Sequence, residues 1–98
     1  MKMFRTDSLI GLPLKINRNH SIYIPFEYLR YYDISEQHDK LSLEISVHSI
    51  FYRPLRNKPM PGTKIKPIRT GLTQLPAAWM HQNNLSAGDY VHLLGKTD

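Results

Sequence analysis

One order of local patterns occurs twice in this chain, about fifty residues apart. The stretch SIYIPFEYLRYYDISEQHDKLSLEI, residues 21–45, has an alternating apolar segment, a proline, a short aromatic segment, an aspartate and a second alternating segment. The stretch TQLPAAWMHQNNLSAGDYVHLL, residues 73–94, follows the same order. A unit of about 45 residues rarely buries enough apolar surface to fold alone. We therefore expect the two copies to build one shared core.

A shift of 51 positions shows which residues the two copies have in common. The matches fall on the proline that opens each helical pattern, on the turn and on the inward positions of the last strand. These are positions that a fold needs, so they indicate an internal duplication. The matching pairs are Lys15 with Lys66, Arg18 with Arg69, Pro25 with Pro76, Ser35 with Ser86 and, once one residue is dropped from the turn, Asp39 with Asp89.

The apolar spacing predicts a mainly β fold with short helices. Residues 40–47, KLSLEISV, alternate strictly between apolar and polar and form the clearest strand. Proline at the start of residues 25–34 and 76–84 favours a short helix in each copy. In the first helix, Phe26 and Leu29 are expected to face inward.

Four segments follow from these patterns. Residues 1–12 are expected to be a poorly structured lead-in, and residues 13–53 the first repeat. Residues 54–63, rich in proline and basic side chains, are expected to be a linker. Residues 64–95 are expected to be the second repeat.

Charge points to a polyanionic partner. The 98 residues carry a formal charge of +5, with a sequence pI near 9.6, and contain no cysteine. Six basic residues and no acidic one lie between positions 53 and 69. This stretch suits a loop that follows phosphates, while a solvated linker is the alternative reading.

The two stretches resemble the swapped-hairpin DNA-binding motif of the AbrB/MazE/SpoVT family. There, a strand ending in Ile-Pro, a short helix, an apolar residue, Gly-Asp and a strand follow one another, and two copies interleave into one small barrel. The resemblance covers about 65 of the 98 residues. Departures are His20-Ser21 in place of Gly-Arg, Asp33 in place of glycine, and Leu72 in place of a basic residue.

The resemblance implies a swapped-hairpin, AbrB-like β-barrel, formed here by two repeats of one chain as a pseudo-symmetric monomer or a homodimer. It also implies a cytoplasmic regulator of transcription, bacterial or archaeal, that binds double-stranded DNA through basic loops. Arg and Lys are the side chains suited to guanine edges and phosphates. The expected DNA contacts are Arg18, Arg69, Lys15, Lys66, Arg30 and His20, with Lys58 and Lys64 as secondary phosphate contacts.

Two other functions remain open. One is a protein-binding module, such as an antitoxin-like or phage- or plasmid-type inhibitor, that docks an acidic partner through the same basic face and through apolar positions such as Phe51 or Tyr52. The other is single-stranded nucleic-acid binding through Tyr28, Tyr31 and Tyr32, although core packing is the commoner use of such residues.

Enzymatic function is not expected. The five histidines show no metal-ligand spacing, and there is neither a nucleophile elbow nor a glycine-rich phosphate loop. We expect no metal and no cofactor. Charged residues or prolines interrupt every apolar run well short of 18 residues, so we expect no membrane span. The first residues also lack the apolar region of a signal peptide.

Overall fold

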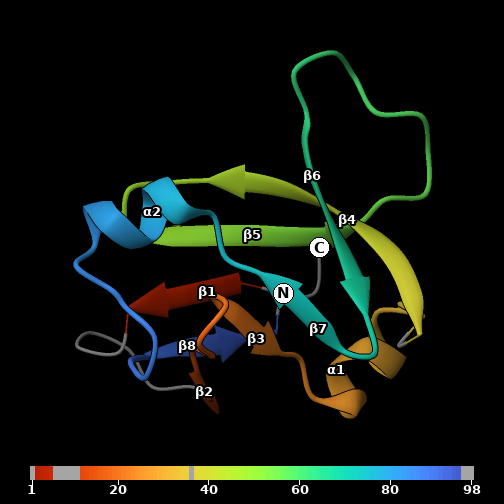
Figure 1. The fold of residues 1–98 in the computed structure, drawn as a ribbon. Helices are drawn as coiled ribbons and strands as arrows, with labels where there is room; N and C mark the ends of the chain where they lie inside the picture. Colours follow the sequence, from red (N-terminus) through yellow and green to blue (C-terminus); the bar gives the residue numbers. More distant parts are fainter. Residues whose placement is uncertain (1, 6–11, 36, 96–98) are drawn as a thin grey trace.

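In the part of the chain that the structure describes, eight antiparallel strands form one sheet that curls into a half-barrel, with two short helices beside it (Figure 1). The structure, a computed structural model, describes residues 2–5, 12–35 and 37–95. The fold is therefore mainly β, as the apolar spacing predicts. The elements are β1 (Lys2–Arg5), β2 (Leu12–Lys15), β3 (Ser21–Tyr23), α1 (Phe26–Tyr31), β4 (His38–Ile45), β5 (Ser49–Pro54), β6 (Lys64–Arg69), β7 (Leu72–Gln74), α2 (Ala77–Gln82) and β8 (Tyr90–Leu94).

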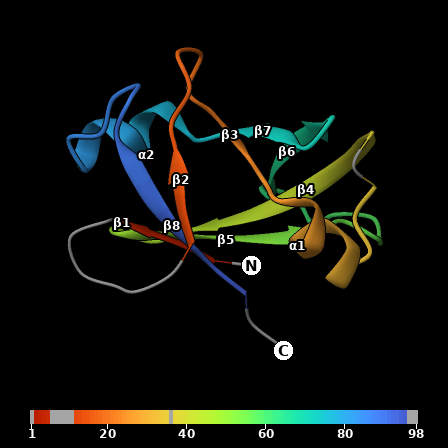
Figure 2. The same cartoon turned by 90° about the horizontal axis from the view of Figure 1, so that it is seen from below.

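The strand order is β2-β8-β1-β5-β4-β6-β7-β3. The two outer strands in this order, β2 and β3, follow each other in the chain and meet at a tight turn, as Figure 2 shows from below. There the Asn17 N–H donates to the Ser21 carbonyl at 2.8 Å. The curl thus brings the two ends of the sheet together at this hairpin.

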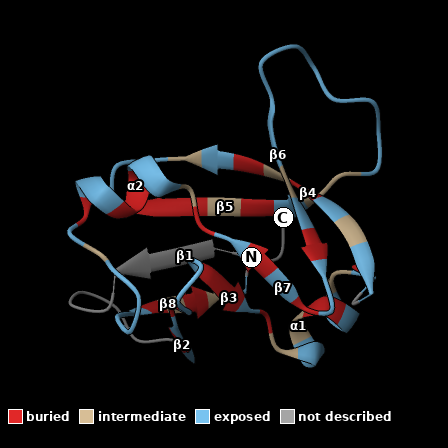
Figure 3. Ribbon diagram, in the orientation of Figure 1, coloured by how far each residue is buried: buried red, intermediate tan, exposed pale blue. Residues whose placement is uncertain are grey.

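The core lies on the inner side of the curl (Figure 3). Alternate residues of β4 and β8 point into it, including Leu41 and Val91, which are fully buried. Helices of six residues are too short to be stable alone in water. Leu29 anchors α1 in the core, and Trp79 and Met80 anchor α2. Each fully buried side chain of this size contributes about 1.5–3 kcal/mol relative to exposure.

Residues 25–39 and 76–89 share several details of backbone geometry. After α1 the Ile34 N–H donates to the Leu29 carbonyl at 2.8 Å, and after α2 the Leu85 N–H donates to Met80 at 2.9 Å. These four positions are related by the same shift of 51. Asp33 and Asn84 are both left-handed, with φ of 56° and 54°. The Asp39 carboxylate accepts from the Ser35 N–H at 2.9 Å, and the Asp89 carboxylate accepts from the Ser86 N–H at 2.8 Å.

The structure corrects the expectation for residues 1–12. Residues 2–5 form β1, which pairs with β5 on one side and β8 on the other. A strand of four residues is too short to be identified from its period, and here two neighbouring strands stabilise it by pairing with its backbone groups. The segment 6–11 lies outside the described residues.

Two smaller expectations also change. Phe26 is not inward: its side chain is 46% exposed, since the helix turns Leu29 to the core instead. Val47, at the end of the clearest predicted strand, lies beyond β4 and is exposed. The predicted linker contains a loop over residues 55–63, which projects from the sheet between β5 and β6 (Figure 1).

Candidate nucleic-acid interface

Residues opposite each other in an antiparallel ladder point to the same face of the sheet. Across β3, β7, β6 and β4, one such row contains Tyr23, Leu72, Arg69 and His38. All four side chains are exposed. This row therefore lies on the outer face, away from the core.

The neighbouring row on the same outer face adds a second cation beside Arg69. Lys40 on β4 lies opposite Pro67 on β6, and both are exposed. On the other side of β3, Lys15 on β2 lies opposite Tyr90 on β8, and both are again exposed. The outward surface is defined here by Lys15, Arg18, Tyr23, Lys40, Arg69 and Leu72.

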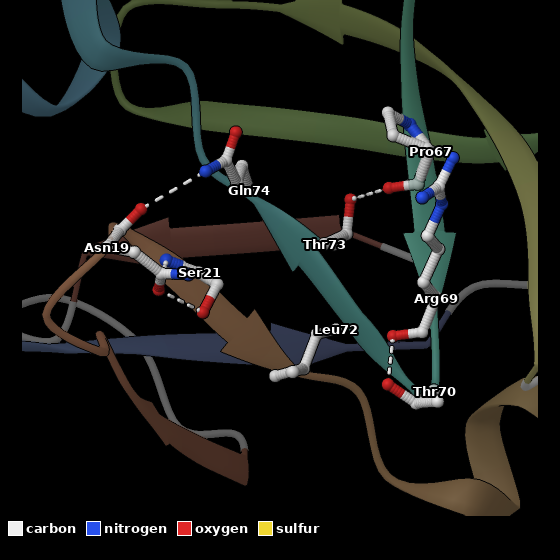
Figure 4. Close-up of a pocket in the computed structure, with 8 residues that line it drawn as sticks. All are labelled: Asn19, Ser21, Pro67, Arg69, Thr70, Leu72, Thr73 and Gln74. Carbon is white, nitrogen blue, oxygen red and sulfur yellow. Dashed lines mark hydrogen bonds between the residues drawn. The ribbon is translucent and has the colours of Figure 1, made fainter.

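An open groove of about 240 Å³ crosses this surface (Figure 4). Its lining residues come from the turn after β2 and from β3, β6 and β7, and they include Asn19 and Arg69. The Gln74 side chain donates to the Asn19 carbonyl at 3.3 Å, which ties β7 to that turn. Figure 4 shows the Arg69 side chain lying along β6 beside Pro67. The groove is smaller than the roughly 300–1,000 Å³ of a typical small-molecule site.

The first hairpin turn, residues 17–21, is held by its own side chains. The Asn17 amide donates to the Ser21 hydroxyl at 3.2 Å, and that hydroxyl donates to Asn19 Oδ1 at 2.6 Å. The His20 N–H donates to the Asn17 carbonyl at 2.9 Å, which places Arg18 at the second position of a β-turn. His20 itself is left-handed, with φ 65°. Arg18 is therefore exposed at the tip of a braced turn.

The second hairpin turn is shorter. Thr70 and Gly71 both have positive φ, at 49° and 80°, as in the type I′ turns that join strands through two residues. The Thr70 hydroxyl donates to the Arg69 carbonyl at 2.7 Å. A Cβ at position 71 would lie 2.7 Å from Cε2 of Tyr23, so the Tyr23 ring packs directly on this glycine.

The predicted contact residues divide into two groups. Lys15, Arg18, His20 and Arg69 are all exposed at the outward surface or in its first turn. The others lie elsewhere. Lys66 faces the core side of β6, opposite Leu41. Lys58 lies in the projecting loop, and Lys64 begins β6. Arg30 lies on α1, with its guanidinium 5.8 Å from the centre of the Phe26 ring.

Strand pairing also changes the alignment of the two expected repeats in the residues that precede their hairpin turns. The Ile16 N–H donates to the Asp89 carbonyl at 2.8 Å, while Ile68 lies opposite Asp39. Since Asp39 and Asp89 are equivalent, Ile16 corresponds to Ile68, one position away from the shift of 51. Arg69 thus corresponds to Asn17. Arg18 lies in a turn that is one residue longer, so the two arginines are not a structural pair.

Sequence reasoning missed His38 and Lys40. His38 begins β4 and lies opposite Arg69. The signal was present in the alternation of residues 38–45, because His38 and Lys40 fall on the face opposite Leu41 and Leu43. The alternation does not predict which strand lies beside β4.

Asp39, the acidic residue between His38 and Lys40, is already paired. Asp39 points away from His38 and Lys40, and Arg56 contacts its carboxylate at 3.0 Å. Partial burial works to raise the pKa of Asp39, but hydrogen bonds from the Ser35 N–H, the Arg56 side chain and the Lys40 N–H together lower it below its ordinary value. Its charge is thereby balanced within the protein.

Within residues 2–5, 12–35 and 37–95, none of the helices has the length and apolar character that a membrane-spanning helix needs. Nor do these residues bring three His, Cys, Asp or Glu side chains together in a way that could hold a metal ion.

No protein-family model matches the chain, and neither a curated protein nor a solved structure is significantly similar to it.

Proposed function

We propose that this chain is a regulator of transcription that binds double-stranded DNA, built from two AbrB-like swapped-hairpin repeats that share one core. In this proposal the outward surface docks on the duplex. As a DNA-bound regulator it acts in the cytoplasm of a bacterial or archaeal cell.

Strand pairing supports the repeat part of the proposal. The hairpin β2–β3 precedes α1 and β4 in the first repeat, yet β2 pairs with β8 of the second. In the same way β6 of the second repeat pairs with β4 of the first. In the family that the sequence resembles, two copies of the motif exchange hairpins in this way, usually between two separate chains. One chain that supplies both halves needs no partner to fold, so we propose a pseudo-symmetric monomer.

The observation that carries the DNA-binding proposal is the placement of cations on both sides of β3–β7. Lys15 and Arg18 lie on one side, Arg69 and Lys40 on the other, and all four are exposed. Neither outward row contains an acidic residue. Duplex DNA carries one charge per about 1.7 Å of its axis, so a surface with separated cations can contact several phosphates at once.

The experiment is a salt titration of duplex binding. The purified chain is bound to a labelled mixed-sequence duplex of about two helical turns, and the affinity is followed by fluorescence anisotropy from about 50 to 200 mM salt. If each of the four cations neutralises one phosphate, the log–log slope reaches roughly −3.6, and it is less steep by about 0.9 for a cation that contacts a base edge instead. Changing Lys15, Arg18, Lys40 and Arg69 together to Gln should remove most of this slope.

The matched control is Lys66→Gln. It removes the same charge from the same strand as Arg69, but from the other face. It should leave the slope nearly unchanged. Equal losses for Lys66→Gln and Arg69→Gln would contradict the placement of the interface, and absence of salt-dependent binding by the unaltered chain would contradict the function.

The second candidate function, a protein-binding module, is favoured by α1. Phe26 is 46% and Tyr31 66% exposed, and both line a shallow groove with Arg30. At the equivalent positions α2 has Ala77 and Gln82. The surface proposed from the sequence needs correction, because Tyr52 is fully buried and its hydroxyl donates to the Gln74 carbonyl at 3.2 Å.

A test of this alternative uses the second helix as a template. The double change Phe26→Ala, Tyr31→Gln gives α1 the outer residues of α2, so the fold should be retained. Loss of a co-purifying acidic protein, with duplex binding unchanged, would favour the protein-binding function. Loss of duplex binding instead would place α1 in the DNA interface.

A further inference from the structure

We infer that the duplex site is asymmetric: Arg18, at the tip of the first turn, reads base edges in one half, while the second half is held mainly through its phosphates. This inference rests on the proposed function and adds to it which residue determines sequence specificity.

The two halves of the outward surface are comparable position by position. The Ile24 N–H donates to the Gly71 carbonyl at 2.8 Å, and the Leu75 N–H donates to the His20 carbonyl at 3.0 Å. The shift of 51 converts one of these hydrogen bonds into the other. The two hairpin turns therefore occupy equivalent places at opposite ends of the β3–β7 ladder, and any difference between them is a difference between the half-sites.

The first turn is built to project a long side chain. It has three residues between Asn17 and Ser21, ending in the left-handed His20, as three-residue hairpin loops do. Asn19 Oδ1 accepts from both the Ser21 hydroxyl at 2.6 Å and the Ser21 N–H at 3.2 Å. Because its neighbours on both sides are held, Arg18 loses less conformational entropy from the backbone when it binds.

The second turn has no long side chain at its tip. It consists of Thr70, whose hydroxyl is bonded to the Arg69 carbonyl, and Gly71, on which Tyr23 packs. Arg69 precedes the turn and lies along β6 in the groove rather than beyond it (Figure 4). From this position a guanidinium can contact a phosphate that rests on the sheet.

The chemistry of the side chains fits this division. Arginine can donate two parallel hydrogen bonds to O6 and N7 of guanine, a contact that discriminates against other bases by about 1–3 kcal/mol. Lysine binds phosphate as a point charge and discriminates less. A projecting arginine in one half and only strand-borne cations in the other half therefore predict recognition of a site that is not palindromic.

The test is selection of duplexes from a random-sequence pool by the unaltered chain, by Arg18→Lys and by Arg69→Lys. Both changes keep the charge and remove the bidentate donor. The unaltered chain should enrich a non-palindromic motif that contains guanine in one half. Arg18→Lys should lose about tenfold or more in discrimination between the selected duplex and one with that guanine replaced. Arg69→Lys should keep the motif.

The outcomes separate the two claims. A palindromic motif, no motif, or equal loss of discrimination in the two variants would overturn the asymmetry while duplex binding itself stands. Absence of duplex binding by the unaltered chain at any salt concentration would overturn both the inference and the proposed function.

Discussion

Ile22 and Thr73 lie opposite each other in the β3–β7 ladder, and they are also equivalent residues under the shift of 51. Both are buried. In the proposed two-repeat architecture, a pair that maps onto itself marks the point where a pseudo-twofold axis would pass through the sheet. The neighbouring pairs, Ser21 with Gln74 and Tyr23 with Leu72, exchange places under the same shift. Under the proposed repeat architecture, the outward surface is therefore a pair of comparable halves.

A shared core predicts that the chain can be cut but its halves cannot fold alone. A cut between Asn57 and Lys58 lies in the exposed loop between β5 and β6. Among the described strands, four of the seven pairings join one side of this cut to the other. Circular dichroism should show that each fragment alone is unfolded. A mixture of the two fragments should fold, and its unfolding midpoint should depend on the protein concentration.

The intact chain is the control, and its unfolding midpoint should not change with concentration. Cooperative unfolding of either fragment by itself would contradict the shared core.

Much of this fold was predictable from the sequence, since it depends on local signals. The strict alternation around Leu41 and Leu43 predicts β4, and Pro25 and Pro76 correctly predict two short helices. The central strand β1 was not predictable, because four residues carry no usable period and their pairing depends on distant strands.

The candidate site was predictable only in part. Arg18 and Arg69 were chosen because they match under a fixed shift, and both are exposed. The two arginines are not equivalent in the structure, because the first turn has one extra residue. That residue shifts the alignment of the preceding strands by one position. Lys40 was missed because only the β4–β6 ladder brings it beside Arg69's strand.

Among the glycines that the structure describes, Gly71 is predicted to be the least tolerant of substitution. Its φ of 80° costs an L-residue about 1–2 kcal/mol. A Cβ would also press on Tyr23, which adds roughly 1 kcal/mol for Gly71→Ala. Gly62→Ala is the matched control, because φ is 86° there and nothing lies within 4 Å of the added carbon.

Urea unfolding measures both variants. In the double variant Tyr23→Ala, Gly71→Ala the additional cost should disappear. If it persists, the ring is not its cause.

His20→Gly is predicted to stabilise the protein. His20 has a φ of 65°, close to that of its equivalent Gly71. Removing left-handed strain gains about 1–2 kcal/mol, and the added freedom of glycine in the unfolded chain costs about 0.5–1. The expected net gain is roughly 0.5–1 kcal/mol in urea unfolding. Arg18→Gly, in the same turn but without positive φ, should give no gain; a gain of equal size there would contradict the strain argument.

Protonation of Asp39 is predicted to lower the stability of the fold at low pH. Since its pKa is lowered in the folded state, its contribution is complete above the ordinary value of 3.8 and is lost as the pH falls through the lower folded value. Arg56→Ala should raise the pKa of Asp39 toward the ordinary value and cost less than about 1 kcal/mol near neutral pH, since the pair is partly exposed. Carboxyl chemical shifts followed by NMR measure the titration. An unchanged Asp39 titration in Arg56→Ala would show that the ion pair has no influence.

The most direct test of the central claim is to map the surface that contacts DNA. Amide chemical shifts of the labelled chain are followed by NMR as a mixed-sequence duplex is added. We expect the largest changes at residues 15–20, 38–40 and 69–74, and small changes over α2 and the loop 55–63. Changes confined to α1 or to that loop, or no changes at all, would contradict the account.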